Sequence, residues 1–108
     1  MATARIPQPI SEDPVRVDPK HYKVEFENER VRVLRINYGP GEKSVMHSHP
    51  ESIAVFLTDA HGKFNYPDGR SEDINANAGT VMHMDACTHL PESTSKTPFA
   101  VVTIELKR

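Results

Sequence analysis

Apolar and polar residues alternate along this chain from residue 21 onward, and the alternation restricts the folds that it can adopt. Over residues 22–26 every second residue is apolar, and the residues between them are charged. After a polar stretch the alternation continues over residues 31–33, and it resumes over residues 34–38 with a shift of one residue. A period of two is typical of a β-strand, in which alternate side chains point to opposite faces. The pattern therefore predicts two half-buried strands that form a hairpin, with a β-bulge at the shift.

Turn-forming residues divide the rest of the chain into short apolar runs. The turn signals lie at residues 39–41, 50–51, 59–62, 67–69, 75–79 and 96–98. Between them no window shows helical periodicity for more than about two turns. In the last run, over residues 99–106, four alternating apolar residues share one face of a strand. The fold class that we predict is all-β, an antiparallel sandwich or barrel.

The chain has 108 residues, which is enough for one small domain with a single core. Four of its nine prolines lie in the first nineteen residues, where no periodicity is seen. Because proline interrupts helices and strands, we expect residues 1–19 to form an extended N-terminal arm and residues 20–108 to form the β-barrel domain. The single cysteine, Cys87, excludes an internal disulfide and agrees with a reducing compartment.

The charge balance and the hydropathy exclude two classes of partner. Thirteen Lys and Arg residues against fifteen Asp and Glu residues give a net charge of -2, without the basic runs of a nucleic-acid-binding protein. No apolar stretch approaches the roughly 20 residues that span a bilayer, and the first ten residues lack the features of a signal peptide. We therefore expect a cytoplasmic protein that binds neither nucleic acid nor a membrane.

Six histidines in so short a chain are the feature of the composition that points to chemistry, because histidine is the commonest metal ligand in proteins. His47 and His49 are two residues apart on an expected strand, so both imidazoles point to one face with their Cβ atoms about 7 Å apart. Two such rings can bind one metal ion at about 2.1 Å per bond. A third ligand has to come from another strand, where His83 and His89 are the candidates.

Less specific interpretations of these residues stay open at this point. A pair of histidines two apart on a strand is more often a surface or packing feature, and we expect His21 and His61 to be exposed. His83 can line a pocket or face the solvent. Cys87 can approach the site as a ligand or a redox-active thiol, or it can fill a tight turn as a small buried residue.

The pair at His47 and His49 resembles the first motif of the cupin superfamily, in which a glycine, here Gly41, precedes the first histidine by six residues. Gly79 and His89 are similar to the glycine and the histidine of the second cupin motif, although the turn before His89 is one residue short. The resemblance extends over most of the chain and implies a jelly-roll-like cupin barrel of the small single-domain (RmlC-like) type. It also implies that His47, His49 and His89 are the ligands of one divalent transition metal.

The sequence departs from the cupin pattern at the position of the family's glutamate ligand, where Ile53 stands instead. Three neutral imidazoles without a carboxylate leave a divalent ion with a formal charge of +2, which attracts anionic ligands more strongly. This pattern is similar to that of cupin dioxygenases that bind Fe(II) and an anionic, chelating substrate. We expect Ile53 to form an apolar wall of the pocket. We expect Glu51 at the rim and not as a fourth ligand, because Pro50 interrupts the strand alternation between it and His49.

From this resemblance we expect an enzyme with a small-molecule substrate, and we favour an Fe(II)-dependent dioxygenase. Two alternatives stay open: a lyase, isomerase or cyclase in which zinc, nickel or manganese acts only as a Lewis acid, and a non-catalytic module that binds a metal or a small molecule. No residue is identified as a catalytic acid or base. Residues 21–34 and 46–50 are similar to a group of small bacterial cupins named for an association with β-alanine degradation. Single-domain cupins commonly form homodimers through their sheets, and we expect a homodimer here.

Overall fold

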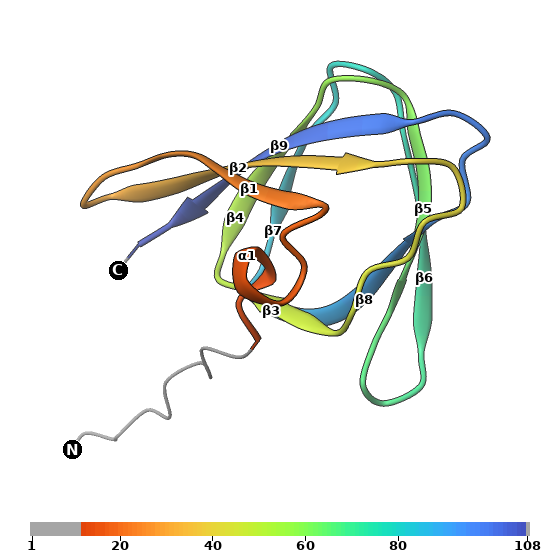
Figure 1. Ribbon diagram of the computed structural model, residues 1–108, viewed down its shortest axis with the longest axis horizontal. Coiled ribbons are helices and arrows are strands. Elements are labelled where there is room, and N and C mark those ends of the chain that lie inside the picture. Colours follow the sequence, from red (N-terminus) through yellow and green to blue (C-terminus); the bar gives the residue numbers. More distant parts are fainter. Residues whose placement is uncertain (1–11, 108) are drawn as a thin grey trace.

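The computed structural model describes residues 12–107, which form two antiparallel β-sheets packed face to face and one helical turn (Figure 1). The first sheet has five strands in the order β1 (Tyr22–Glu27), β2 (Val31–Tyr38), β9 (Phe99–Leu106), β4 (Ser52–Phe56) and β7 (Val81–Met84). The second has four strands in the order β3 (His47–His49), β8 (Cys87–Ser93), β5 (Ala60–Asn65) and β6 (Ser71–Ala76). This architecture confirms the predicted all-β antiparallel sandwich.

The predicted hairpin of β1 and β2 is present, but its irregularity lies elsewhere. β2 pairs with β9 residue for residue over its whole length, whereas the register between β1 and β2 shifts between Val24 and Phe26 of β1. The one-residue shift of the apolar pattern within β2 is not a bulge. It arises because both faces of this strand carry apolar side chains. Leu34 and the alternate residues after it are buried between the sheets, whereas Val31 and Val33 lie on the outer face.

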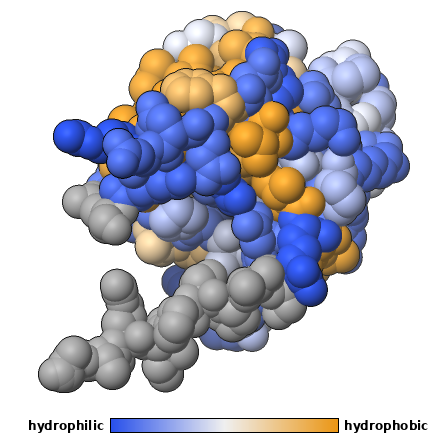
Figure 2. Space-filling view, turned by 60° about the vertical axis from the view of Figure 1, so that its left-hand side comes forward, coloured by the Kyte–Doolittle hydropathy of each residue, from blue (hydrophilic) through white to orange (hydrophobic). Residues whose placement is uncertain are grey.

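The outer face of the five-stranded sheet is mostly apolar. In β9 the buried side chains are those of Val101, Thr103 and Glu105, so the four alternating apolar residues of this strand lie on the opposite, outer face. In the sheet register Ile53 of β4 lies beside Ile104 of β9 on this face. Hydrophobic side chains also gather into a broken band on the surface that Figure 2 shows. An apolar outer face of this kind marks a candidate surface for protein–protein contact.

Apolar side chains from both sheets fill the space between them. The buried set is Tyr22, Leu34, Ile36, Tyr38, Ala54, Phe56, Ala60, Ala76 and Val101. Their removal from water contributes about 25 cal/mol per Å² of apolar surface and is the main driving force for such a fold. The hydroxyl groups of Tyr22 and Tyr38 are hydrogen bonded to each other at 2.7 Å, so these two polar atoms can lie inside the core.

Residues 12–19 do not form the extended arm that the prolines predict. Asp13 caps the helical turn α1 (Pro14–Val17) by accepting a hydrogen bond from a backbone N–H of the turn, and Pro14 is buried at the first helical position. Proline suits this position because its fixed φ favours a helix start and its missing N–H has no partner to lose. α1 packs beside β1 and β3 (Figure 1), and no helix among the described residues is long and apolar enough to cross a membrane. Residues 1–11 of the expected arm lie outside the described residues.

Candidate metal centre

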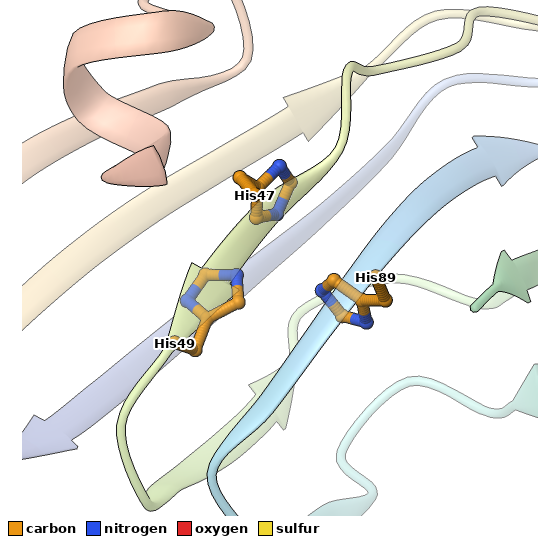
Figure 3. Close-up of side chains that lie close together, drawn as sticks. All are labelled: His47, His49 and His89. Carbon is orange, nitrogen blue, oxygen red and sulfur yellow. The ribbon is translucent and has the colours of Figure 1, made fainter. Parts of the chain in front are cut away.

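Two adjacent strands bring three of the histidines together. In the register of β3 and β8, His47 lies directly opposite His89, and His49 follows His47 on the same face of β3. The three rings point toward one another (Figure 3). Their ligand atoms lie within 4.8 Å of one another. The structure thus places His89 beside the histidine pair, whereas His83, the other candidate, lies outside this cluster on β7.

Hydrogen bonds behind two of the rings determine which nitrogen faces the cluster. His47 Nδ1 donates a hydrogen bond to the carbonyl oxygen of Val45 at 2.8 Å, and His49 Nδ1 donates one to the carboxylate of Glu105 at 2.8 Å. The carbonyl and carboxylate oxygens accept these bonds, so Nδ1 of each ring carries a proton, and Nε2 is the nitrogen that can offer a lone pair to a metal. The Nε2 atoms of His47 and His49 are therefore free to bind a cation.

Two ring nitrogens of the cluster are buried without a partner. Within the described part of the chain, the Nε2 atoms of His47 and His89 are the buried side-chain atoms that lack a hydrogen bond. A buried polar atom in this state costs about 1–3 kcal/mol. The two residues face each other across β3 and β8, so one shared cation would satisfy both. These residues therefore fit a bound divalent metal.

Burial keeps these two histidines in the form that binds metals. Burial, and secondly the neighbouring His49, lower the pKa of His47 to about 4. The same two causes, with burial again the larger, lower the pKa of His89 to about 2. At neutral pH both imidazoles are uncharged and have a lone pair to offer, as a metal ligand must.

Glu105 is a residue of the site that the sequence analysis missed. Its side chain is 4% exposed, and its two oxygens accept hydrogen bonds from His49 Nδ1 at 2.8 Å and from Arg32 Nε at 2.9 Å. A carboxylate behind a metal-binding imidazole fixes the orientation of the ring and raises its basicity. A glutamate near the end of a strand is ordinarily assigned to the surface. The signal in the sequence is its spacing: Glu105 follows Val101 and Thr103 at every second position of β9, so all three side chains point inward.

Ile53 does not line the interior cavity, contrary to the expectation that it forms an apolar wall. On β4 the buried residues are Ser52, Ala54 and Phe56, and Ile53 alternates with them, so its side chain points to the outer face. Pro50 lies in the turn between β3 and β4, so the alternation of faces cannot be counted through it from the histidines to Ile53. An error of one residue in such a count moves every side chain of the strand to the other face. Within residues 12–107 the cluster consists of histidines alone, so it still lacks a carboxylate ligand.

Glu51 and His83 lie away from the histidine cluster. Glu51 Oε2 is 2.7 Å from His83 Nε2, and 54% of the His83 side chain is exposed. The register explains the exposure, because His83 pairs with Ile53 and shares its outward face. The structure therefore places His83 at the surface, where it is exposed and lines an open groove, and places Glu51 outside the cluster of candidate ligands.

Cys87 lies between the histidine cluster and an open groove at the surface. Its Sγ atom is 3.8 Å from His89 Nδ1, and it lines the groove together with His83 and residues of β6. Burial raises the pKa of the thiol, so it is protonated at neutral pH. A protonated thiol is a poor nucleophile, and Cys87 is not among the side chains whose ligand atoms converge in the cluster. Both observations favour the packing role of Cys87 over the chemical one.

The remaining two histidines differ from each other. His61 is exposed, as expected. His21 is 4% exposed, which corrects the expectation for this residue, and its ring nitrogens lie 2.7 Å from Asp18 and 3.0 Å from Glu42. The ring also stacks on Tyr38. His21 is buried because the N-terminal segment folds onto the barrel, which the sequence pattern did not predict.

An interior cavity of about 80 Å³ lies next to the cluster. His49 and His89 are part of its lining, which is otherwise mostly apolar or aromatic. The ring centroid of Phe64 lies 4.3 Å from that of His89. The charged residues of the lining, Lys63 and Glu92, are partners in the register of β5 and β8 and balance each other. The cavity can therefore hold a small molecule beside a metal ion.

Comparison with solved structures identifies the fold. The chain is 27% identical to a cupin domain from Bordetella pertussis Tohama I, with a TM-score of 0.74 over 81% of this chain and 92% of that one. A cupin superfamily protein from Desulfitobacterium hafniense is 15% identical, with a TM-score of 0.60 over 81% of this chain and 76% of that one. An oxalate decarboxylase from Lactobacillus farciminis, solved as a formate complex, is 17% identical, with a TM-score of 0.55 over 73% of this chain and 24% of that one. The protein has the cupin fold. No protein-family model and no curated protein matches the chain.

Proposed function

We propose that this protein holds one divalent transition metal on His47, His49 and His89 and acts on a small-molecule substrate. The observation that supports the proposal most directly is the pair of buried Nε2 atoms, of His47 and His89, that have no partner among the described residues. The hydrogen bonds at Nδ1 of His47 and His49 add to it, because they leave the Nε2 lone pairs free on the side of the cluster (Figure 3).

We favour Fe(II) as the metal and an oxygenase reaction on an anionic, chelating substrate. Three neutral imidazoles leave the full +2 charge of the ion uncompensated, which favours an anionic ligand. When bound, the ion would supply Lewis acidity at open coordination positions and, as iron, the electrons for dioxygen chemistry. The chain's own residues would orient the ligands and exclude water: Glu105 holds the ring of His49, and Phe64 covers that of His89.

The cavity limits the size of the substrate and offers it at most one tyrosine hydroxyl as a hydrogen-bond donor. Its volume of about 80 Å³ corresponds to on the order of six water-sized atoms. Tyr22 and Tyr38 line it, and burial raises the pKa of Tyr22 well above its ordinary value and that of Tyr38 to about 12. At neutral pH both hydroxyl groups keep their protons, so neither serves as a base; one donates to the other, which leaves at most one O–H for a substrate.

A second candidate is a lyase reaction in which zinc, nickel or manganese acts only as a Lewis acid. The observation that favours it is the similarity in fold to an oxalate decarboxylase. A non-catalytic binding module would use the same histidines without turnover. The group of cupins named for β-alanine degradation, which residues 21–34 and 46–50 resemble, does not by its name decide between these reactions.

We also propose that the protein is a homodimer that associates through the outer face of the five-stranded sheet. This face is mostly apolar, and on it the side chains of Phe26 and Val81 are 50% and 65% exposed. A second copy placed against this face would remove such side chains from water, which is the driving force of most homodimer interfaces.

Oxygen uptake separates the catalytic candidates. The protein is freed of metal, loaded with Fe(II) or Zn(II), and mixed with small thiols, β-diketones and hydroxy acids in an oxygen electrode. Uptake by the iron form alone, lost in His47→Ala and kept in the exposed control His61→Ala, is the expected result. Equal product formation by the zinc form without oxygen would support the lyase instead. No turnover by either form would contradict both and leave the binding module.

A further inference from the structure

The helical turn α1 is connected to the histidine cluster at its N-terminal end. Asp13 caps the turn and accepts two hydrogen bonds from the guanidinium group of Arg32, at 2.9 and 3.0 Å. Arg32 Nε donates to one oxygen of Glu105 at 2.9 Å, and the other oxygen accepts from His49 Nδ1 at 2.8 Å. A continuous series of charged groups thus leads from the cap of α1 to a proposed metal ligand.

The C-terminal end of α1 is connected in a similar way to His47. Asp18, which follows the turn, accepts a hydrogen bond from Ser44 Oγ at 2.5 Å. The same hydroxyl oxygen lies 3.3 Å from His47 Nδ1. Asp18 and Ser44 are both buried, so water does not compete strongly for these hydrogen bonds. Both ends of one helical turn therefore contact groups that lie behind the two histidines of β3.

The ionic series is most buried where it meets the histidine and becomes more open toward α1. The exposed fraction of the side chain is 4% for Glu105, 16% for Arg32 and 35% for Asp13. A buried carboxylate needs a partner of opposite charge, and the planar fork of a guanidinium group fixes the geometry of that pair. Asp13 holds both terminal nitrogens of Arg32 and so directs its Nε toward Glu105. The orientation of the His49 ring depends in this way on a residue outside the barrel strands.

We propose that Asp13 and Arg32 are positioning residues of the metal centre and that docking of α1 and metal binding are coupled. The inference rests on the proposed function, because it gives these residues a role toward the metal ion. Neither of them contacts the cavity, and both act through Glu105. Because coupling between two sites is reciprocal, a metal ion that binds better when α1 is docked must also hold α1 more firmly in place.

The variant Asp13→Asn tests the coupling while it preserves the helix cap, because asparagine caps helices as well as aspartate does. We expect the dissociation constant for Co²⁺ to rise about tenfold, at the lower end of the range for groups behind a ligand. The visible absorption spectrum of bound Co²⁺ should change as well. Arg32→Lys keeps the charge but lacks the fork, so it should change both in the same direction. The matched control is Asp68→Asn, since Asp68 also pairs with an arginine, but in the turn between β5 and β6.

Hydrogen exchange gives a second measurement of the same coupling. Addition of Co²⁺ to the wild-type protein should slow amide exchange in residues 13–18, and Asp13→Asn should lose this protection. Equal Co²⁺ affinity in the wild type and both variants would overturn the inference alone. The inference would also be overturned if the variants lost Co²⁺ affinity only because their metal-free forms no longer fold, which thermal unfolding would show. Failure of the wild type to bind Co²⁺ would overturn the proposed metal centre and the inference with it.

Discussion

Lowering the pH should destabilise the metal-free protein through His47 and His89. Burial holds the pKa of His47 at about 4 and that of His89 at about 2, whereas both titrate near 6.5 in an unfolded chain. Between pH 6.5 and about 4 the unfolded chain therefore binds protons at these positions that the folded chain does not. The contribution of the two residues to stability is complete above pH 6.5 and is lost as the pH falls.

The structure also gives the size of the effect. Each proton taken up only by the unfolded chain lowers the free energy of unfolding by about 1.4 kcal/mol per pH unit. The two histidines together lower the free energy of unfolding by roughly 2–3 kcal/mol between pH 6 and pH 5. This is a large part of the total for a typical domain, which is about 5–15 kcal/mol. The pKa of Glu42 is lowered to about 2, first of all by a hydrogen bond from the backbone N–H of Gly39. Glu42 therefore changes the free energy of unfolding only below its ordinary pKa of 4.5.

Urea unfolding of the metal-free protein, followed by circular dichroism at pH 7, 6 and 5, measures this slope. His47→Gln removes one of the two groups and should show about half of the slope. His61→Gln is the control, because the ring of His61 is exposed, and it should keep the wild-type slope. A free energy of unfolding that stays constant between pH 6.5 and 4.5 would refute the account of two buried, neutral imidazoles.

Two further substitutions test other parts of the account. Glu105→Gln keeps the size of the side chain and removes its charge, so it should weaken metal binding about 10–100-fold in competition with a chelator. Unchanged affinity would show that Glu105 does not orient His49. Ile53→Asp places a charge on the apolar outer face, so light scattering should show a monomer in place of the homodimer, with the metal content per chain unchanged. Loss of the metal in this variant would instead place Ile53 at the site.

The fold class was predictable because it depends on short-range regularities. Alternation and turn residues each act over a few positions, and together they require an antiparallel sheet structure. The cluster was predictable for a related reason, since His47 and His49 share a face of one strand by their spacing alone. The third member needed the cupin resemblance, because the spacing of the histidines does not show that β8 lies beside β3.

The parts that were missed depend on which face of a strand is turned inward. β4 and β9 carry apolar residues on both faces, so hydropathy alone does not distinguish Ile53, which points outward, from the inward positions beside it. The same ambiguity hid Glu105, an inward carboxylate on a mostly apolar strand. The turn α1 was missed because long-range ion pairs, such as that of Asp13 with Arg32, hold it in place, and a local sequence pattern does not contain them.

The metal content per chain is the decisive measurement for a metal centre on His47, His49 and His89. The wild type, the double variant His47→Ala with His49→Ala, and the control His61→Ala are loaded with Zn²⁺ or Co²⁺, dialysed and submitted to elemental analysis. We expect one equivalent of metal in the wild type and in His61→Ala, and none in the double variant. A full equivalent in the double variant, or none in the wild type, would contradict it.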